Sequence, residues 1–249
     1  MIYGNIIDMN IILFEKLNEK NILSQKDERA RHIKKILHLN IGDVFSCGEI
    51  NGPKGEALIT AIDDDEIEFT FHALDYSSKD LFPVTLLVSQ VRPICMKRIL
   101  REAVCLGVEK IIITGADLTE KSYTKANFYI NGDYKKVLFE GAMQAAQTGM
   151  SEVIFTASLD EAVKYFDSSY NKILLDNVLK SDKLSSWTCD KNKTKTVLSV
   201  GPERGYTDRE RNLLLENGFE AKTIGSRVLR TETANSVGLG LLLGRLNLL

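Results

Sequence analysis

The residues best suited to chemistry gather in one short segment, residues 226 to 234, between two apolar stretches. It holds Arg227, Arg230 and Glu232 together with three hydroxyl side chains. A guanidinium group can stabilise negative charge that develops during a reaction, and a carboxylate can accept a proton. Such a cluster at the end of a strand is typical of a ligand site. A simpler interpretation is that Arg230 and Glu232 pair with each other and cap the last helix.

A second segment, Gly201 to Gly205, reads Gly-Pro-Glu-Arg-Gly and directly follows an apolar run. Its glycines permit backbone angles and a close approach of a ligand that a Cβ atom would block. The spacing is not that of the dinucleotide-binding Gly-x-Gly-x-x-Gly motif, and no Gly-Lys-Ser/Thr follows as in a P-loop. The segment is therefore either an ordinary turn between a strand and a helix or a ligand loop of another kind.

Regular elements must hold these two segments in place. Val197 to Val200 is apolar and rich in β-branched residues, which predicts a buried strand. Thr207 and Glu210 have the spacing of a capping box, so a helix should begin at Thr207. A short strand from about Ala221 to Ile224 leads into the 226–234 segment, and a final helix follows. Open α/β sheets bind ligands in loops at the carboxyl ends of parallel strands, where both segments are expected to lie.

This stretch resembles the signature of a known family. Gly201-Pro202-Glu203-x-Gly205, then Gly218-Phe219, then Ile224-Gly225-x-Arg227 through Ala234 are similar to the bacterial 16S ribosomal RNA uracil-N3 methyltransferases. These are SPOUT-class enzymes that use S-adenosylmethionine. The resemblance implies an α/β fold with a deep trefoil knot, in which the two glycine loops and a third loop hold the cofactor. Such knots are rare exceptions to the rule that chains do not thread themselves.

The resemblance also implies roles for individual residues, with the third cofactor loop at Leu174-Leu175-Asp176. The residues implied to bind S-adenosylmethionine are Leu175, Gly201, Pro202, Glu203, Gly205, Ile224, Gly225, Val228, Leu229, Arg230 and Thr231. Arg230 is the expected catalytic cation, either stabilising the anion of the uracil imide or orienting the cofactor carboxylate. The N3 proton of uracil is expected to leave to water or to Glu232.

Short strands and turns dominate residues 1–77, which are expected to form a small β-barrel domain. Asn51 to Gly55 is a strong hairpin signal, and Glu66 to His72 alternates like a half-buried strand. One helix, Asp27 to Leu39, interrupts the strands. Its basic residues include Arg29, Arg31, His32, Lys34 and Lys35.

Composition alone favours a solvated face for this basic helix. However, the pattern Arg31-His32-Ile33-x-x-Ile36-Leu37, followed by Gly42-Asp43, resembles the PUA-like N-terminal domain of the same methyltransferase family. That resemblance implies that the helix contacts the RNA backbone.

Residues 78–249 are expected to form the SPOUT methyltransferase domain, because strands alternate with helices as in a parallel α/β sheet. Strands are predicted at Val84 to Ser89, Lys110 to Thr114 and Lys172 to Asp176, and one long helix from Asn127 to about Thr148. The further residues expected to contact RNA are Arg92, Lys97, Arg204 and Arg227.

Composition limits the partners of this chain. A net charge of -2 over 249 residues gives no global attraction to nucleic acid, so RNA binding must depend on local basic patches. The cysteines lack C-x-x-C spacing and the histidines lack ligand neighbours, so neither a disulfide framework nor a metal is expected. The apolar stretch Val237 to Leu249 is too short to span a bilayer, and no secretory signal is visible. We expect a cytoplasmic protein with no membrane partner, and a homodimer through the knot domain.

Several positions depart from the family pattern. Arg204 stands where the family usually has glycine, and Ala146 and Met150 replace a usual Glu and Arg. Arg204 would either obstruct the cofactor or extend outwards to an RNA phosphate. The primary expectation is methylation of uracil N3 in 16S ribosomal RNA of the small ribosomal subunit. The alternatives are methylation of another RNA site, or a non-catalytic RNA-binding or ribosome-assembly protein.

Overall fold

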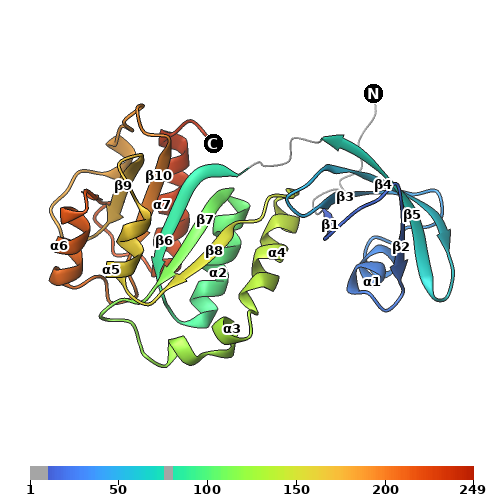
Figure 1. Ribbon diagram of the computed structural model, residues 1–249, viewed down its shortest axis with the longest axis horizontal. Coiled ribbons are helices and arrows are strands. Elements are labelled where there is room, and N and C mark those ends of the chain that lie inside the picture. The colour runs from blue at the N-terminus through green and yellow to red at the C-terminus, as the bar shows by residue number, and fades with distance from the viewer. Residues whose placement is uncertain (1–10, 76–80) are drawn as a thin grey trace. The chain divides into compact units, whose positions relative to one another are not determined.

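The computed structural model describes residues 11–75 and 81–249, and the chain divides into two compact units (Figure 1). The first unit holds the described residues before Asp80 together with Ala142–Met150, and the second holds Leu81–Gly141 and Ser151–Leu249. The sequence placed residues 142–150 in the second domain, whereas the structure returns them to the first unit. Two hydrogen bonds explain this return, because Asn51 N donates to Thr148 O at 2.8 Å and the Lys54 side chain donates from Nζ to Ala146 O at 2.7 Å.

The first unit is built on a five-stranded sheet with the order β1-β3-β4-β5-β2. Its strands are β1 Ile12–Phe14, β2 Lys20–Ser24, β3 Val44–Glu49, β4 Lys54–Ile62 and β5 Glu66–Asp75. The β1–β3 pair is parallel, and the other pairs are antiparallel. The sheet curls into half a barrel (Figure 1), which confirms the predicted β-barrel type of this domain.

Helix α1 (Glu28–Lys35) packs on this sheet and is shorter than the predicted Asp27 to Leu39. Asp27 is its N-cap and accepts a hydrogen bond from Arg29 N, as its position before the helix suggests. Ile33 enters the core beside Phe45 and Phe69. The helix ends early because the chain turns at His38, which has a φ of 54°. The predicted hairpin is present between β3 and β4.

The second unit contains a six-stranded parallel sheet with the order β11-β9-β10-β6-β7-β8. Its strands are β6 Phe82–Ser89, β7 Val108–Thr114, β8 Glu152–Thr156, β9 Tyr170–Leu175, β10 Lys195–Val200 and β11 Glu220–Lys222. The predicted parallel α/β architecture is therefore confirmed. The trefoil knot that the family resemblance implies stays a prediction.

Helices cover both faces of this sheet (Figure 1). They are α2 Pro93–Cys105, α3 Asn127–Ile130, α4 Tyr134–Gln144, α5 Leu159–Ala162, α6 Asp208–Glu216 and α7 Thr231–Arg245, with short 3-10 turns at Tyr123–Lys125, Val163–Tyr165 and Leu184–Ser186. Val197 packs with Phe166 and Leu214 on the face that α5 and α6 cover. Its neighbour Leu198 points to the other face, toward Gly238 of α7. This alternation is what a strand buried on both faces requires.

The long helix predicted from Asn127 to Thr148 is wrong. Two helices, α3 and α4, take its place, because the chain turns at Gly132 with a φ of 76°. A glycine adopts this left-handed backbone without the steric cost that a Cβ atom imposes. The predicted final helix is present as α7, which begins at Thr231 inside the 226–234 segment.

Candidate active site

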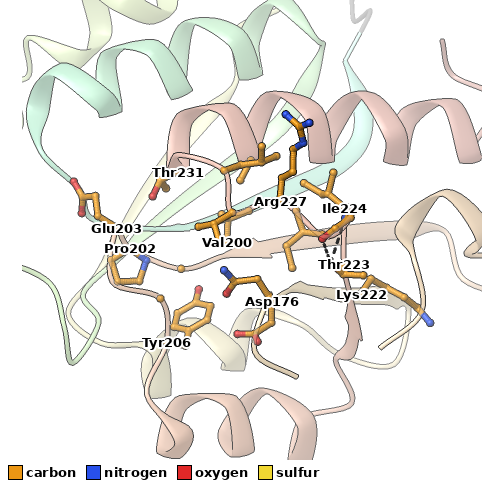
Figure 2. Close-up of a pocket in the computed structure, with 18 residues that line it drawn as sticks. Asp176, Val200, Pro202, Glu203, Tyr206, Lys222, Thr223, Ile224, Arg227 and Thr231 are labelled. Atoms are coloured by element: carbon orange, nitrogen blue, oxygen red, sulfur yellow. Dashed lines mark hydrogen bonds between the residues drawn. The ribbon is translucent and has the colours of Figure 1, made fainter. Parts of the chain in front are cut away.

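The loops that follow β9, β10 and β11 meet over one cavity of about 120 Å³, called here the loop cavity. These strands are neighbours in the sheet, so their carboxyl ends open at the same edge. Figure 2 shows the labelled side chains from the three loops around this space. The predicted cofactor residues that line it are Leu175, Gly201, Pro202, Glu203, Gly205, Ile224, Gly225, Val228, Leu229 and Thr231. Arg230 is the predicted cofactor residue that lies outside this lining.

Glycines shape the loop cavity. Gly205 has a φ of 73° and donates its N–H to Pro202 O at 2.9 Å, which closes the turn after β10. A Cβ atom on Gly201 would lie 3.2 Å from the ring of Tyr206, so the loop packs tightly there. A Cβ atom on Gly225 would meet nothing within 4 Å. Gly225 is held by two hydrogen bonds with the Thr223 hydroxyl, drawn dashed in Figure 2.

Sequence reasoning missed Tyr206, and it placed Asp176 in the third loop without giving this residue a role, although both line the loop cavity. Asp176 accepts a hydrogen bond from Arg211 Nε at 2.8 Å, and both side chains are almost fully buried. Tyr206 is buried, which raises the pKa of its hydroxyl to about 12, and it lies 3.0 Å from Ser199 Oγ. The phenol therefore stays protonated and does not act as a base. The position of Tyr206 directly after Gly205 was a signal that could have found it.

A larger cavity of about 640 Å³, called here the charged cavity, shares Glu203, Val228, Leu229 and Thr231 with the loop cavity. Both predicted catalytic residues, Arg230 and Glu232, line it. Its other charged or polar residues include Arg92, Cys95, Asp117, Thr119, Glu120, Tyr123 and Arg204. The structure therefore brings cations from three separate segments to the edge of the loop cavity.

The simple capping interpretation of Arg230 and Glu232 is not supported. Arg230 is the N-cap residue of α7, but its side chain makes no capping hydrogen bond. The Glu232 carboxylate lies 3.7 Å from Arg98 Nη1 and is mostly buried. Burial and the nearby carboxylates of Glu232 and Glu203 raise the pKa of the Cys95 thiol, so this cysteine stays protonated.

The residues predicted to contact RNA divide between the two units. In the second unit, Arg92 and exposed Arg204 line the charged cavity, and Arg227 lines the loop cavity. Lys97 lies on α2 with its Nζ 5.6 Å from the ring centre of Phe128. Arg204 lies outside the lining of the loop cavity, which favours the outward orientation over obstruction of the cofactor.

In the first unit, Arg29 is committed to internal contacts. Its guanidinium bonds Asp27 at 2.7 Å, donates to Leu13 O and lies 4.6 Å from the ring centre of Phe14. The remaining cations of the predicted RNA surface are better placed for a partner: Arg31, Lys34 and Lys35 are exposed, and His32 is half-buried. Their contact with RNA stays a prediction.

Within residues 11–75 and 81–249, no group of three or more His, Cys, Asp or Glu side chains could hold a metal ion. No helix in the same ranges is long and apolar enough to cross a membrane.

The parallel sheet, the three loops at its carboxyl edge and the charged cavity beside them lie within residues 78–243, which match the RNA methyltransferase domain family, so this unit is an RNA methyltransferase domain. Ribosomal RNA small subunit methyltransferase E of Treponema pallidum is 34% identical over 91% of this chain and 87% of the relative. Ribosomal RNA small subunit methyltransferase E 1 of Borreliella burgdorferi is 33% identical over 91% of this chain and 94% of the relative. The chain belongs to the ribosomal RNA small subunit methyltransferase E family.

Solved structures share the fold. Ribosomal RNA small subunit methyltransferase E from Neisseria gonorrhoeae, bound to S-adenosyl methionine, has a TM-score of 0.78 at 22% identity and covers 95% of this chain and 97% of its own. A methyltransferase from Legionella pneumophila, in complex with the same cofactor, has a TM-score of 0.78 at 18% identity with the same coverage.

Proposed function

We propose that this protein transfers a methyl group from S-adenosylmethionine to N3 of a uracil in 16S ribosomal RNA of the small ribosomal subunit. The observation that carries the proposal is the junction of the two cavities. Val228, Leu229 and Thr231 line both, so a ligand in the loop cavity borders a second ligand in the charged cavity. Methyl transfer needs this arrangement, since donor and acceptor must be held in line and away from water.

The residues of the loop cavity fit S-adenosylmethionine. Leu175, Ile224 and Val228 offer apolar contacts for an adenine ring, and the backbone groups of the glycine loops can bond its edge. The open space at the Cβ position of Gly225 leaves room for a ligand against the backbone. When bound, this cofactor supplies a methyl group on a sulfonium, which is an activated electrophile.

Residues of the charged cavity would prepare the acceptor. Uracil N3 carries a proton, and its lone pair is delocalised until that proton leaves. Arg230 would stabilise the negative charge that then spreads over the carbonyl oxygens. Glu232, oriented by Arg98, is the candidate proton acceptor in the chain, and water is the other.

The RNA must present its target base splayed out of any stack, because a paired base hides N3. Arg92 and Arg204 at the charged cavity would contact the flanking phosphates. The exposed cations Arg31, Lys34 and Lys35 of α1 would hold RNA on the first unit.

We also propose that the enzyme is a cytoplasmic homodimer that pairs through α7 of the knot domain. Two features of α7 support this pairing. Val237 is 38% exposed, and Cβ atoms on Gly240 and Gly244 would meet nothing within 4 Å. Sedimentation as a monomer would contradict the dimer.

Calorimetric titration with S-adenosylmethionine tests cofactor binding. A micromolar dissociation constant is expected, which corresponds to a binding free energy of about -8 kcal/mol.

Small subunits that lack the modification are then incubated with the protein and cofactor, and modified bases are mapped by mass spectrometry. Methyl-uracil in 16S RNA from the parent, and at least about a hundredfold less from Arg230→Gln, is expected. A methylated base elsewhere would favour the alternative that the enzyme methylates another RNA site. RNA binding without cofactor binding would favour the alternative of a non-catalytic RNA-binding or ribosome-assembly protein.

A further inference from the structure

The first turn of α6 carries two buried charged side chains that face different loops. Glu210 is 0% exposed and Arg211 is 7% exposed. Charged groups of this kind are rarely fully buried unless they are paired or hydrogen-bonded. The partners of each therefore indicate what the buried charge holds in place.

Glu210 joins the loop after β7 to the start of α6. Its Oε1 accepts from Asp117 N at 2.9 Å, and its Oε2 accepts from Thr207 N at 2.8 Å. Asp117 also accepts from the Thr207 hydroxyl at 2.9 Å, which reinforces the same link. Asp117 begins the segment that continues to Glu120 along the wall of the charged cavity. Glu210 thus fixes one wall of that cavity.

A carboxylate is the side chain that this position requires. Two backbone N–H groups from different segments point at its two oxygens, so both oxygens must be acceptors. In Gln the amide nitrogen would face one of these N–H donors and leave it unpaired in a buried site.

Arg211 supports the loop cavity. Its Nε donates to Asp176 Oδ2 at 2.8 Å. The second oxygen of Asp176 accepts from Val178 N at 2.7 Å and Leu179 N at 2.8 Å, which orders the loop after β9. Asp176 lines the loop cavity, where Figure 2 shows it. Arg211 thus fixes the carboxylate that shapes this third loop.

We propose that Glu210 and Arg211 are positioning residues for different ligands: Glu210 sets the wall of the charged cavity that receives the RNA, and Arg211 sets the loop that holds the cofactor. This inference rests on the proposed function for the identity of the two ligands. Adjacent residues of one helical turn therefore govern the two cavities separately. Buried, charge-assisted hydrogen bonds suit this role because they hold the loops before either ligand arrives.

The test compares Glu210→Gln and Arg211→Gln with the parent. Glu216→Gln is the matched control, because Glu216 is an exposed carboxylate at the end of the same helix. Glu210→Gln should lower kcat/KM for the RNA at least about tenfold, with the dissociation constant of S-adenosylmethionine within about twofold of the parent. Arg211→Gln should raise that dissociation constant about tenfold or more. Glu216→Gln should match the parent in kcat/KM for the RNA and in the dissociation constant of S-adenosylmethionine.

Amide hydrogen exchange gives a readout that does not depend on activity. Exchange at Asp117 should accelerate in Glu210→Gln but not in Arg211→Gln, and exchange at Val178 and Leu179 should show the reverse. If both variants weaken both ligands and loosen both loops alike, the residues only stabilise the fold and the inference is overturned. Unchanged exchange in both variants would overturn it as well. A parent that binds no cofactor refutes the proposed function instead, while the exchange pattern still decides whether each residue fixes its own loop.

Discussion

Gly238 of α7 lies against Leu175 so closely that a Cβ atom on the glycine would stand 2.5 Å from Leu175 Cδ1. Leu175 is the last residue of β9 and lines the loop cavity. The last helix therefore packs directly behind a residue that faces the proposed cofactor. Small changes on this face of α7 should be transmitted to the cavity through one leucine side chain.

Gly238→Ala should push the Leu175 side chain toward the cavity and weaken binding of S-adenosylmethionine about tenfold, since overpacking costs roughly 1–3 kcal/mol. Glu216→Ala is the control, because Glu216 is an exposed residue at the end of α6, outside the proposed α7 interface. The control should keep both the affinity and the stability of the parent within about 0.5 kcal/mol. Calorimetry and thermal unfolding measure the two quantities. Equal affinities in the two variants would refute the contact as the cause.

Gly225→Ala should separate binding from stability. The added Cβ meets no protein atom within 4 Å, so the free energy of unfolding should stay within about 0.5 kcal/mol of the parent. The cofactor should bind at least about tenfold more weakly, because the methyl group occupies space against the backbone that the ligand needs. Gly201→Ala is the comparison, since its Cβ would press on Tyr206 and should cost stability too. Full affinity in Gly225→Ala would place the cofactor elsewhere.

Arg204→Gly should leave cofactor affinity unchanged and weaken RNA binding. Arg204 is exposed and lines the charged cavity but not the loop cavity. If it contacts one phosphate, the plot of log affinity against log salt should lose roughly one unit of slope. Lys191→Gly removes an exposed cation before the start of β10, away from the cavities, and should keep the slope. Tighter cofactor binding by Arg204→Gly would show that the arginine obstructs the site after all.

Asp27→Asn tests the pH dependence of the first unit. The side-chain hydrogen bond from Arg29 lowers the pKa of Asp27 below its ordinary value of 3.8, although burial acts in the opposite direction. A lowered folded-state pKa stabilises the fold at pH above 3.8, and this contribution is lost as the pH falls through the folded-state pKa. The variant keeps a capping oxygen but loses the charge.

The variant should therefore be less stable than the parent at about pH 6, and the difference should shrink by about pH 3. Urea denaturation followed by circular dichroism measures it. Asp64→Asn, at an exposed carboxylate of the same unit, should show no such pattern. A difference that stays constant with pH would assign the effect to capping and not to charge.

Local signals in the sequence were sufficient to predict the elements that hold the site. The capping box at Thr207, the hairpin at Asn51 and the glycines of the β10 loop each act through contacts within a few residues. The family signature predicted the three loops, and the structure brings their predicted cofactor residues, except Arg230, around one cavity. The helix from Asn127 was misjudged because a single glycine with positive φ broke a continuous pattern.

The sequence by itself determined the α/β class, the glycine loops and the charged segment that follows the last strand. Only the tertiary structure decided which distant residues support them. Glu210 reaches Asp117 and Arg211 reaches Asp176 because the strand order sets β9 between β10 and β11 and brings the β7 loop to the same edge. No short-range preference encodes such pairs, since their geometry exists only after strands far apart in the chain have paired. Buried charges become interpretable only when their partners are known.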